Sequence, residues 1–365
     1  MAEAATPRPE AVTEQPSGVG DQMTSEVAAT YAGKYADDQA YQLAQLLEMQ
    51  KNEIRQLCLT SLHEDFTVKR KMFENGKVEI YRIKADEGQP YKAVMKMRKF
   101  DQQTEARKKR RILQEITVHR YVTRTGCPYI AQIHNTLYNF SSDSCYGFQV
   151  EYLRQGTMIE NYSKLSYAGR LRVCRDVAKG LKHIHSLHIV HADIKMDNIL
   201  VRIGADGQPM GKIIDFGASK VMGLKVTSGH CIGNAWQFAC PELTYPAETR
   251  IVLAASVDIW SFGMMALNSL TPSYQTPWDR ASDHNQDFKY FREHLDSSSE
   301  RSSSRNPVQL QFLGQTPFND LRPFVNYLVT NLLRMDPARR FDMDRVIREL
   351  EGEIPGASTA LELVK

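Results

Sequence analysis

One polar segment between apolar runs constrains the fold of this chain more than any other part of its sequence. Residues 191–198 have the sequence HADIKMDN, and the apolar run 199–201, ILV, follows directly. A turn-rich stretch, residues 204–211, then leads to the apolar pair Ile213-Ile214, which ends at Asp215. Short apolar runs bounded by turn residues predict strands. The pattern therefore predicts two short strands with polar side chains gathered at their ends.

The polar side chains of this segment are those that the transfer of a phosphoryl group requires. A carboxylate such as Asp193 can orient the attacking hydroxyl, and a cation such as Lys195 can meet the γ-phosphate. An amide and a second carboxylate, Asn198 and Asp215, can hold Mg²⁺ through oxygen atoms. Two ordinary polar turns would explain either motif alone, but not both motifs in this order.

These two motifs resemble the catalytic loop, H-R-D-L-x-x-x-N, and the metal-binding D-F-G of the eukaryotic-type protein kinases. Ala192 stands where that family has arginine. Residues 93–96, AVMK, resemble the family's V-A-I-K, and Glu115 lies where the family has the helix glutamate that pairs with the strand lysine. Further resemblances follow in the family's order, within about residues 66–350: CPE at 240–242 for A-P-E, DIWSFG at 258–263 for D-x-W-S-x-G, and DPARR at 336–340 for D-P-x-x-R.

The resemblance implies an α+β, two-lobed protein kinase fold with ATP in the cleft between the lobes. The small lobe would be an antiparallel β-sheet with one main helix, and the large lobe would be mostly helical. By the same resemblance, Asp193 would accept or orient the proton of the substrate hydroxyl, and Lys195 would steady the γ-phosphate. Lys96 would bind the α/β-phosphates and be aligned by Glu115, while Asn198 and Asp215 would hold Mg²⁺. Val150 would lie beside the adenine pocket, and the backbone from Glu151 to Leu153 would bind the base. Arg340 would pair with Glu242 in the large lobe.

Lys195, two residues after Asp193, is typical of the serine/threonine class. The implied function is therefore transfer of the γ-phosphoryl group of Mg-ATP to serine or threonine of a protein substrate. The competing interpretation is a catalytically inactive pseudokinase that serves as a protein-binding scaffold. A small-molecule kinase is disfavoured, because residues 240–258 resemble protein kinases specifically.

Three departures from the family pattern bear on this choice. The glycine-rich loop that should precede Lys96 is reduced to NGKV at 75–78, which favours the scaffold and is weakly similar to apicomplexan secreted kinases without a glycine loop. With Ala192 in place of arginine, a phosphate on Thr227 or Ser228 has no partner in the catalytic loop. Ala235 stands where Ser/Thr kinases usually have threonine.

The chain is expected to divide into five parts. Residues 1–36 lack large apolar groups and predict disorder. Residues 37–62 predict an amphipathic helix that packs on the small lobe and supports the region of the missing glycine loop; a dimerising coil is the alternative. Its expected apolar stripe is Leu43, Leu46, Leu47, Ile54 and Leu57. The small lobe is expected over 63–153, the large lobe over 154–352 and a tail over 353–365.

Composition limits the partners. A net charge of +3 gives no general attraction to nucleic acid, and no run of eighteen apolar residues could span a membrane. The basic run Arg107–Arg111 is either a solvated helix face or a contact with an anionic surface. The six cysteines show no metal-site spacing, which is typical of reduced thiols. Without a recognisable leader the expectation is a cytoplasmic or nuclear monomer, secreted only if a leader was removed.

Overall fold

A computed structural model describes ten stretches of this chain: residues 33–60, 68–76, 78–83, 93–99, 105–139, 145–227, 236–244, 250–271, 322–334 and 336–354. Several sequence predictions lie outside these residues. They are Ser228, Ala235, residues 1–32 of the segment 1–36 expected to be disordered, and residues 355–365 of the tail expected over 353–365. The disorder expected for residues 33–36 was wrong, because backbone hydrogen bonds join Lys34 and Ala36 to Lys225 and Gly223. Among the described residues, no helix has the length and apolar character needed to cross a membrane.

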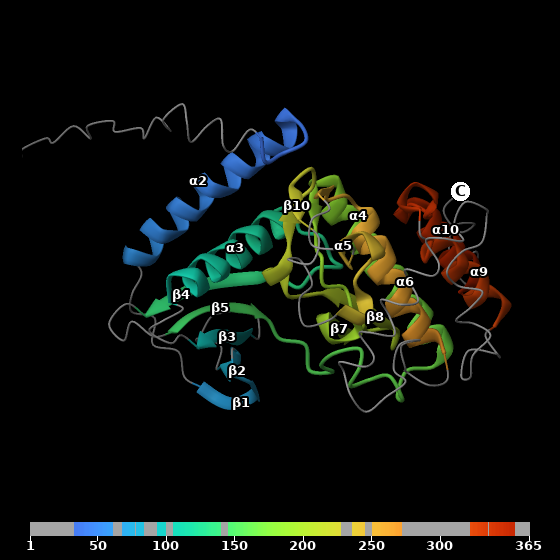
Figure 1. The fold of residues 1–365 in the computed structure, drawn as a ribbon. Coiled ribbons are helices and arrows are strands. Elements are labelled where there is room, and N and C mark those ends of the chain that lie inside the picture. The colour runs from blue at the N-terminus through green and yellow to red at the C-terminus, as the bar shows by residue number, and fades with distance from the viewer. Residues whose placement is uncertain are drawn as a thin grey trace, which may run out of the picture.

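The small lobe is built on a five-stranded antiparallel sheet with the strand order β1-β2-β3-β5-β4. Its first strand begins at Val68. A single long helix, α3, lies across the sheet (Figure 1). The bounds are β1 Val68–Glu74, β2 Val78–Ile83, β3 Ala93–Lys99, α3 Glu105–Thr123, β4 Ile133–Asn139 and β5 Cys145–Glu151.

The alternation of side chains along β3 determines which of them face the helix. Ala93 and Met95 are buried in a cluster on one face of the sheet. Val94 packs into the cluster on the other face, with Ile112 and Ile116 of α3. Because successive strand residues point to opposite faces, Lys96 shares the face of Val94 and is directed toward α3. The pattern A-V-M-K thus places an ammonium group under a helix.

The large lobe consists mainly of helices, with three small two-stranded sheets near the lobe boundary. Its helices are α4 Tyr167–Ser186, α5 Pro241–Thr244, α6 Ser256–Leu270, α9 Pro323–Leu332 and α10 Met343–Glu353, with short 3-10 turns η1 Met196–Asn198, η2 Phe216–Ala218, η3 Trp236–Phe238 and η4 Pro337–Arg339. Its strands are β6 Ile189–Val190, β7 Ile199–Ile203, β8 Pro209–Ile213, β9 Lys220–Val221, β10 Lys225–Thr227 and β11 Arg250–Val252.

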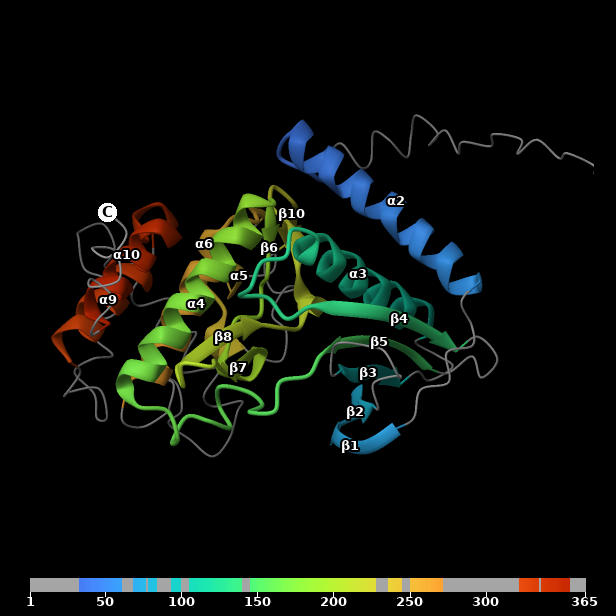
Figure 2. The ribbon, with the colours of Figure 1, turned by 180° about the vertical axis from the view of Figure 1, so that it is seen from behind.

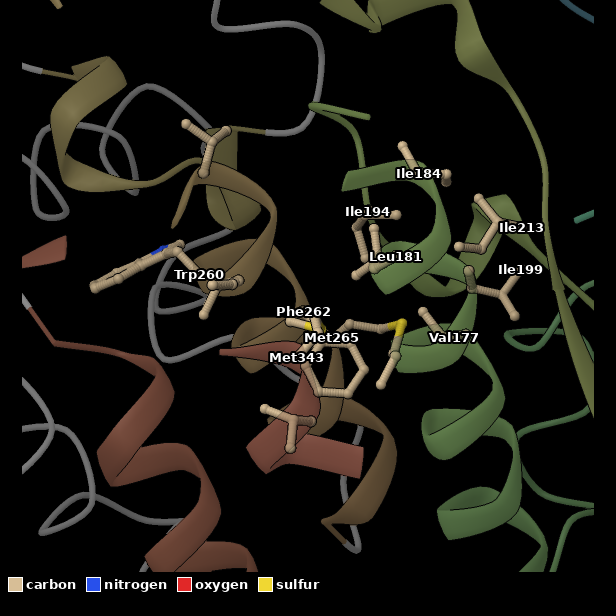
Figure 3. Packing of buried hydrophobic residues seen from close by; sticks show 14 of the residues in the cluster. Val177, Leu181, Ile184, Ile194, Ile199, Ile213, Trp260, Phe262, Met265 and Met343 are labelled. Atoms are coloured by element: carbon tan, nitrogen blue, oxygen red, sulfur yellow. The ribbon is translucent and has the colours of Figure 1, made fainter. Parts of the chain in front are cut away.

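Two helices form the centre of this lobe. α4 begins at the N-cap Ser166, whose hydroxyl accepts the Gly169 N–H, and it buries an apolar stripe at three- and four-residue spacing. α6 is mostly apolar, and all its residues except Ser256 are buried, as expected of a central helix. Figure 3 shows side chains of the two helices meeting those of the strands that flank the polar segment. The polar loop is therefore supported by a large buried apolar cluster.

The N-terminal helix α2, Asp38–Thr60, lies along α3 on the side of the small lobe away from β1 and β2 (Figures 1 and 2). Leu43 and Leu47 are buried, but Leu46 is 40% exposed, so its assignment to the buried stripe was wrong. The side chains of Ile54 and Leu57 lie outside the described set. The expectation that this helix supports the turn between β1 and β2 was also wrong, because the helix lies across the lobe from that turn.

Candidate active site

The polar segment forms a tight loop between β6 and β7 that gathers three of its side chains. Lys195 Nζ lies 2.9 Å and 2.8 Å from the two carboxylate oxygens of Asp193. Asn198 Nδ2 donates to the Asp193 carbonyl at 2.7 Å and to its carboxylate at 2.8 Å. The carboxylate of Asp193 is therefore held by two donors. Because the amide nitrogen of Asn198 is directed at Asp193, its Oδ1 is the atom left to face a ligand.

The backbone of this loop is anchored by a buried carboxylate on α6. Asp258 accepts the N–H of His191 at 2.8 Å and that of Ala192 at 2.7 Å, and His185 Nε2 lies 2.9 Å from it. Burial alone would raise the pKa of Asp258, but its hydrogen bonds with His185 and the Ala192 N–H lower it below its usual value. Ala192 has a φ of 63°, a left-handed conformation that is costly for alanine. The carboxylate bonds thus hold a strained loop.

The turn at the end of β8 is bonded to the same loop. His191 Nε2 donates to the Ile214 carbonyl at 3.0 Å, and the Ile214 N–H donates to the Asn198 carbonyl at 2.9 Å. Since a carbonyl only accepts, His191 carries its proton on Nε2, which leaves Nδ1 to accept the Asp193 N–H at 3.3 Å. Asp215 follows with a φ of 66°, and its Oδ1 accepts the Gly217 N–H at 3.2 Å.

One lysine joins the two lobes at this point. Lys96 Nζ lies 2.5 Å from Glu115 Oε1 and 3.0 Å from Asp215 Oδ2. The side chain of Glu115 is 1% exposed, whereas that of Asp215 is 35% exposed. The buried carboxylate of Glu115 therefore fixes the lysine from the side of α3, whereas the carboxylate of Asp215 remains partly exposed to solvent. The structure brings together Lys96, Glu115 and Asp215, as well as Asp193, Lys195 and Asn198.

The segment expected to hold the base lies at the end of β5. Val150 is buried, and the Glu151 N–H donates to the Gln132 carbonyl at 2.9 Å. The Leu153 carbonyl accepts the Gly156 N–H at 3.2 Å, so these two backbone groups are used within the protein. Glu151 also binds the buried Lys212 of β8 at 2.7 Å. That ion pair, which the sequence did not indicate, fixes this segment to the strand that leads to Asp215.

His119 is the residue of the site that sequence reasoning missed. It lies one turn after Glu115 on α3 and is 1% exposed. Its Nε2 lies 2.7 Å from the Ala131 carbonyl, and its ring centroid is 4.7 Å from that of Phe216. Burial lowers the pKa of His119 to about 4, so the ring is neutral at pH 7. The signal available in the sequence was a histidine on the buried face of a helix, one turn after the paired glutamate.

The turn between β1 and β2 is short where kinases have a glycine-rich loop. The Asn75 N–H donates to the Val78 carbonyl at 2.9 Å, and the Val78 N–H donates to Asn75 Oδ1 at 2.7 Å. These bonds close the hairpin over the two residues between them and use backbone groups on both sides of the turn. A tight hairpin of this kind offers little backbone to a phosphate, in agreement with the motif missing from the sequence.

The side-chain oxygen atoms of Asn198 and Asp215 suit one kind of metal. Among the described residues there is no group of three or more His, Cys, Asp or Glu side chains that could hold an ion by themselves. Asn198 Oδ1 and the Asp215 carboxylate supply only oxygen, on the open side of the site. Mg²⁺ is usually bound by one or two carboxylates together with water and substrate phosphates. These residues therefore fit Mg²⁺ that arrives with a nucleotide.

The fold and this arrangement define a protein kinase domain. The model of that family matches residues 74–350, and the chain belongs to the protein kinase family. It is similar to the serine/threonine-protein kinase pakA of Talaromyces marneffei, with 31% identity over 152 residues, or 39% of this chain and 22% of that protein. It is also similar to shk1/pak1 of Schizosaccharomyces pombe, with 31% identity over 140 residues, or 37% of this chain and 20% of that protein. With shk2 of the same yeast the identity is 27% over 216 residues, or 57% of this chain and 33% of that protein. The matches thus cover no more than about a third of the length of these relatives.

Proposed function

We propose that this chain is a Mg-ATP-dependent protein serine/threonine kinase. The observation that carries the proposal is that two polar sets lie on loops bonded to each other through Ile214: Asp193 with Lys195 and Asn198, and Lys96 with Glu115 and Asp215. Membership in the protein kinase family supports the reaction class. The names of the similar proteins, all serine/threonine-protein kinases, support the type of substrate.

In this proposal Lys96 binds the α- and β-phosphates of ATP. Its ammonium group is held at 2.5 Å by Glu115, which prevents it from turning away when the phosphates approach. Pre-orientation of this kind reduces the entropy lost on binding. Asp215 and Asn198 would hold Mg²⁺, which supplies charge neutralisation for the phosphates. Val150 and the backbone from Glu151 to Leu153 would line the base.

Asp193 is the proposed acceptor for the hydroxyl proton of the substrate. Its carboxylate is fixed by Lys195 and Asn198, so one face is directed at the incoming hydroxyl without further reorganisation. Lys195 lies 2.8 Å from the carboxylate and can meet the γ-phosphate beside it. In this proposal the acceptor and the cation lie next to each other where the oxygen–phosphorus bond would form.

The tight turn between β1 and β2 predicts weak nucleotide binding rather than loss of chemistry. Hydrogen bonds to charged groups contribute about 1.5–3 kcal/mol each, so the loss of a few raises the ATP requirement by roughly tenfold or more. Charge neutralisation by Lys96, Lys195 and Mg²⁺ does not depend on that turn. We therefore expect a high KM for ATP with measurable turnover at saturation.

The test is a phosphotransfer assay at millimolar ATP and Mg²⁺ on a panel of generic protein substrates. Asp193→Asn should abolish turnover and leave nucleotide binding nearly unchanged, because it removes the proton acceptor and little volume. Asp197→Asn is the matched control, since it makes the same change at an exposed position of the same loop. The control should keep the activity of the unaltered chain.

The alternative is a scaffold that retains the fold without turnover, and the short β1–β2 turn is the observation in its favour. It becomes the better interpretation if the unaltered chain shows no transfer above the Asp193→Asn variant on any substrate of the panel.

A further inference from the structure

The chain segment just before α2 is bonded to the segment that follows the Asp215-Phe216-Gly217 turn. The Ala36 N–H donates to the Gly223 carbonyl at 2.8 Å, and the Lys225 N–H donates to the Lys34 carbonyl at 2.9 Å. Between them, Tyr35 and Leu224 form an antiparallel bridge. We call residues 34–36 the leading strand. Its bonds occupy one edge of residues 223–225, only eight residues after Asp215.

The opposite edge of the same segment is held by the large lobe. The Gly223 N–H donates to the Leu253 carbonyl at 2.8 Å, and the Leu253 N–H donates to the Leu224 carbonyl at 3.0 Å. β10 continues this pairing with β11. The start of the activation segment thus has partners on both sides, and one of the two comes from outside the residues that match the kinase family.

The first turn of α2 closes against this segment. Asp37 caps the helix, with its carboxylate accepting the Ala40 N–H at 2.8 Å. Ala40 is 4% exposed, and a Cβ placed on Gly223 would lie 2.7 Å from the Ala40 Cβ. Gly223 also has a φ of 81°, which glycine adopts at little cost. Any larger residue at Gly223 would therefore push the helix away.

The rest of α2 holds the helix that carries Glu115. Leu43 and Leu47 belong to one continuous buried cluster with residues of the C-terminal half of α3, namely Val118, Tyr121 and Val122. The two helices lie side by side in Figures 1 and 2. α3 in turn contacts η2, the turn that begins after Asp215. One N-terminal element therefore binds both α3 and the strand after Asp215, the two parts that supply the carboxylates around Lys96.

We propose that residues 34–47 are a built-in activating element, which positions Glu115 and Asp215 around Lys96 in place of phosphorylation of the activation segment. The inference rests on the kinase function proposed above. The catalytic loop has Ala192 where the family has the arginine that binds a phosphate on the activation segment. Such a phosphate would therefore have no arginine partner in this loop. The leading strand and α2 hold the same segment by backbone bonds and apolar packing, which need no modification.

The test compares two double variants of the full chain. Leu43→Glu with Leu47→Glu places charges on the buried face of α2, where Leu47 is 2% exposed. Leu46→Glu with Met49→Glu is the matched control, because these side chains are 40% and 62% exposed on the same helix. Both changes add two glutamates, so helix propensity and net charge stay comparable. The measurements are kcat, KM for ATP and amide hydrogen exchange.

The buried-face variant is expected to lose at least tenfold in kcat. Its Lys225 amide should exchange faster, because the acceptor on Lys34 leaves with α2, while the Leu253 amide keeps its partner. The control should match the unaltered chain in both respects. The proposal is overturned if the kcat of the buried-face variant lies within twofold of the control, whatever the exchange shows. It is also overturned if kcat falls tenfold while the Lys225 amide stays fully protected from exchange.

A second variant covers the case in which buried glutamates unfold the chain. Ala36→Pro removes one N–H at an exposed residue, and the bridge at Tyr35 already gives the preceding residue the extended form that proline favours. It should lower kcat at least threefold, and an unchanged kcat would refute the inference. If the unaltered chain transfers no phosphate above Asp193→Asn, the proposed function fails. The element is then judged by exchange at the Ile116 amide of α3, which must accelerate in the buried-face variant for the positioning role to stand.

Discussion

Replacement of Asp258 by asparagine should remove the hydrogen bonds that hold the catalytic-loop backbone, with almost no change in side-chain volume. The two carboxylate oxygens of Asp258 accept the N–H groups of His191 and Ala192, one on each oxygen, and His185 adds a third contact. Asparagine has one oxygen and one amide group in the same positions. Whichever way its side chain is turned, one backbone N–H then faces an N–H₂ group.

The magnitude follows from these contacts. Asp258 is fully buried, so no water can replace the lost acceptor. The hydrogen bonds to the carboxylate are charge-assisted and contribute about 1.5–3 kcal/mol each, and a buried N–H left without an acceptor costs about 1–3 kcal/mol. We therefore expect Asp258→Asn to lower the free energy of unfolding by about 3–5 kcal/mol. The left-handed Ala192 should also relax, so kcat should fall together with stability.

Urea unfolding of the full chain at pH 7 measures this loss. Asp206→Asn is the control, because Asp206 is exposed in the β7–β8 turn and asparagine can accept the same Gln208 N–H. The lowered pKa of Asp258 gives the pH test its sign. The carboxylate contributes stability above its unfolded value of 3.8, and this contribution is lost as the pH falls through the lower folded value. A loss below about 1 kcal/mol at pH 7 would refute the reasoning, since a fully used acceptor cannot be replaced at so small a cost.

Three further expectations follow from buried or bonded groups. His119 has an unfolded pKa of 6.5 and a folded pKa of about 4, so unfolding takes up a proton between these pH values. The free energy of unfolding of the unaltered chain should therefore fall by about 1.4 kcal/mol per pH unit from pH 6.5 down to 4, relative to His119→Leu, in urea titrations. Arg340 is fully buried and binds Glu242 at 2.7 Å and 2.8 Å, so Arg340→Met should cost about 3–5 kcal/mol in urea unfolding, and Glu242→Leu added to it should recover part of the loss. Thr227→Ala with Ser228→Ala should keep most of the kcat in the phosphotransfer assay, and a hundredfold loss would show that a cation other than the missing arginine binds a phosphate there.

The sequence predicted the parts of this fold whose residues follow local patterns. The two short strands predicted from the apolar runs at 199–201 and 213–214 depend on neighbouring residues, and they match β7 and the end of β8. The lysine under α3, its glutamate and the loop from 191 to 198 are fixed by strand and turn geometry, and the structure brings them together. Motif order gave the two-lobed arrangement without any knowledge of the packing.

The parts that were missed depend on contacts between distant segments. Leu46 and Leu47 are adjacent leucines, and only the position of α3 decides that Leu47 is buried and Leu46 is exposed. The bonds of the leading strand to Gly223 join residues almost two hundred positions apart, and no local pattern signals them. His119 looked like an ordinary residue on an inner helix face, because its hydrogen bond to the Ala131 carbonyl and its contact with Phe216 exist only in the folded chain.

The free-energy cost of the polar and strained groups in the site favours the enzyme over the scaffold. A buried ion pair such as Lys96 with Glu115 gives little net stability, and apolar residues of similar size would serve a scaffold as well or better. Asp215 has a left-handed backbone, a conformation that recurs at functional sites, and the charged side chains of Lys195 and Asp193 remain partly exposed. The buried apolar clusters that pack the two lobes contain none of these groups. A phosphate-bearing ligand and a hydroxyl acceptor account for all of them together, which is why the lost glycine loop is expected to weaken ATP binding and not to end the chemistry.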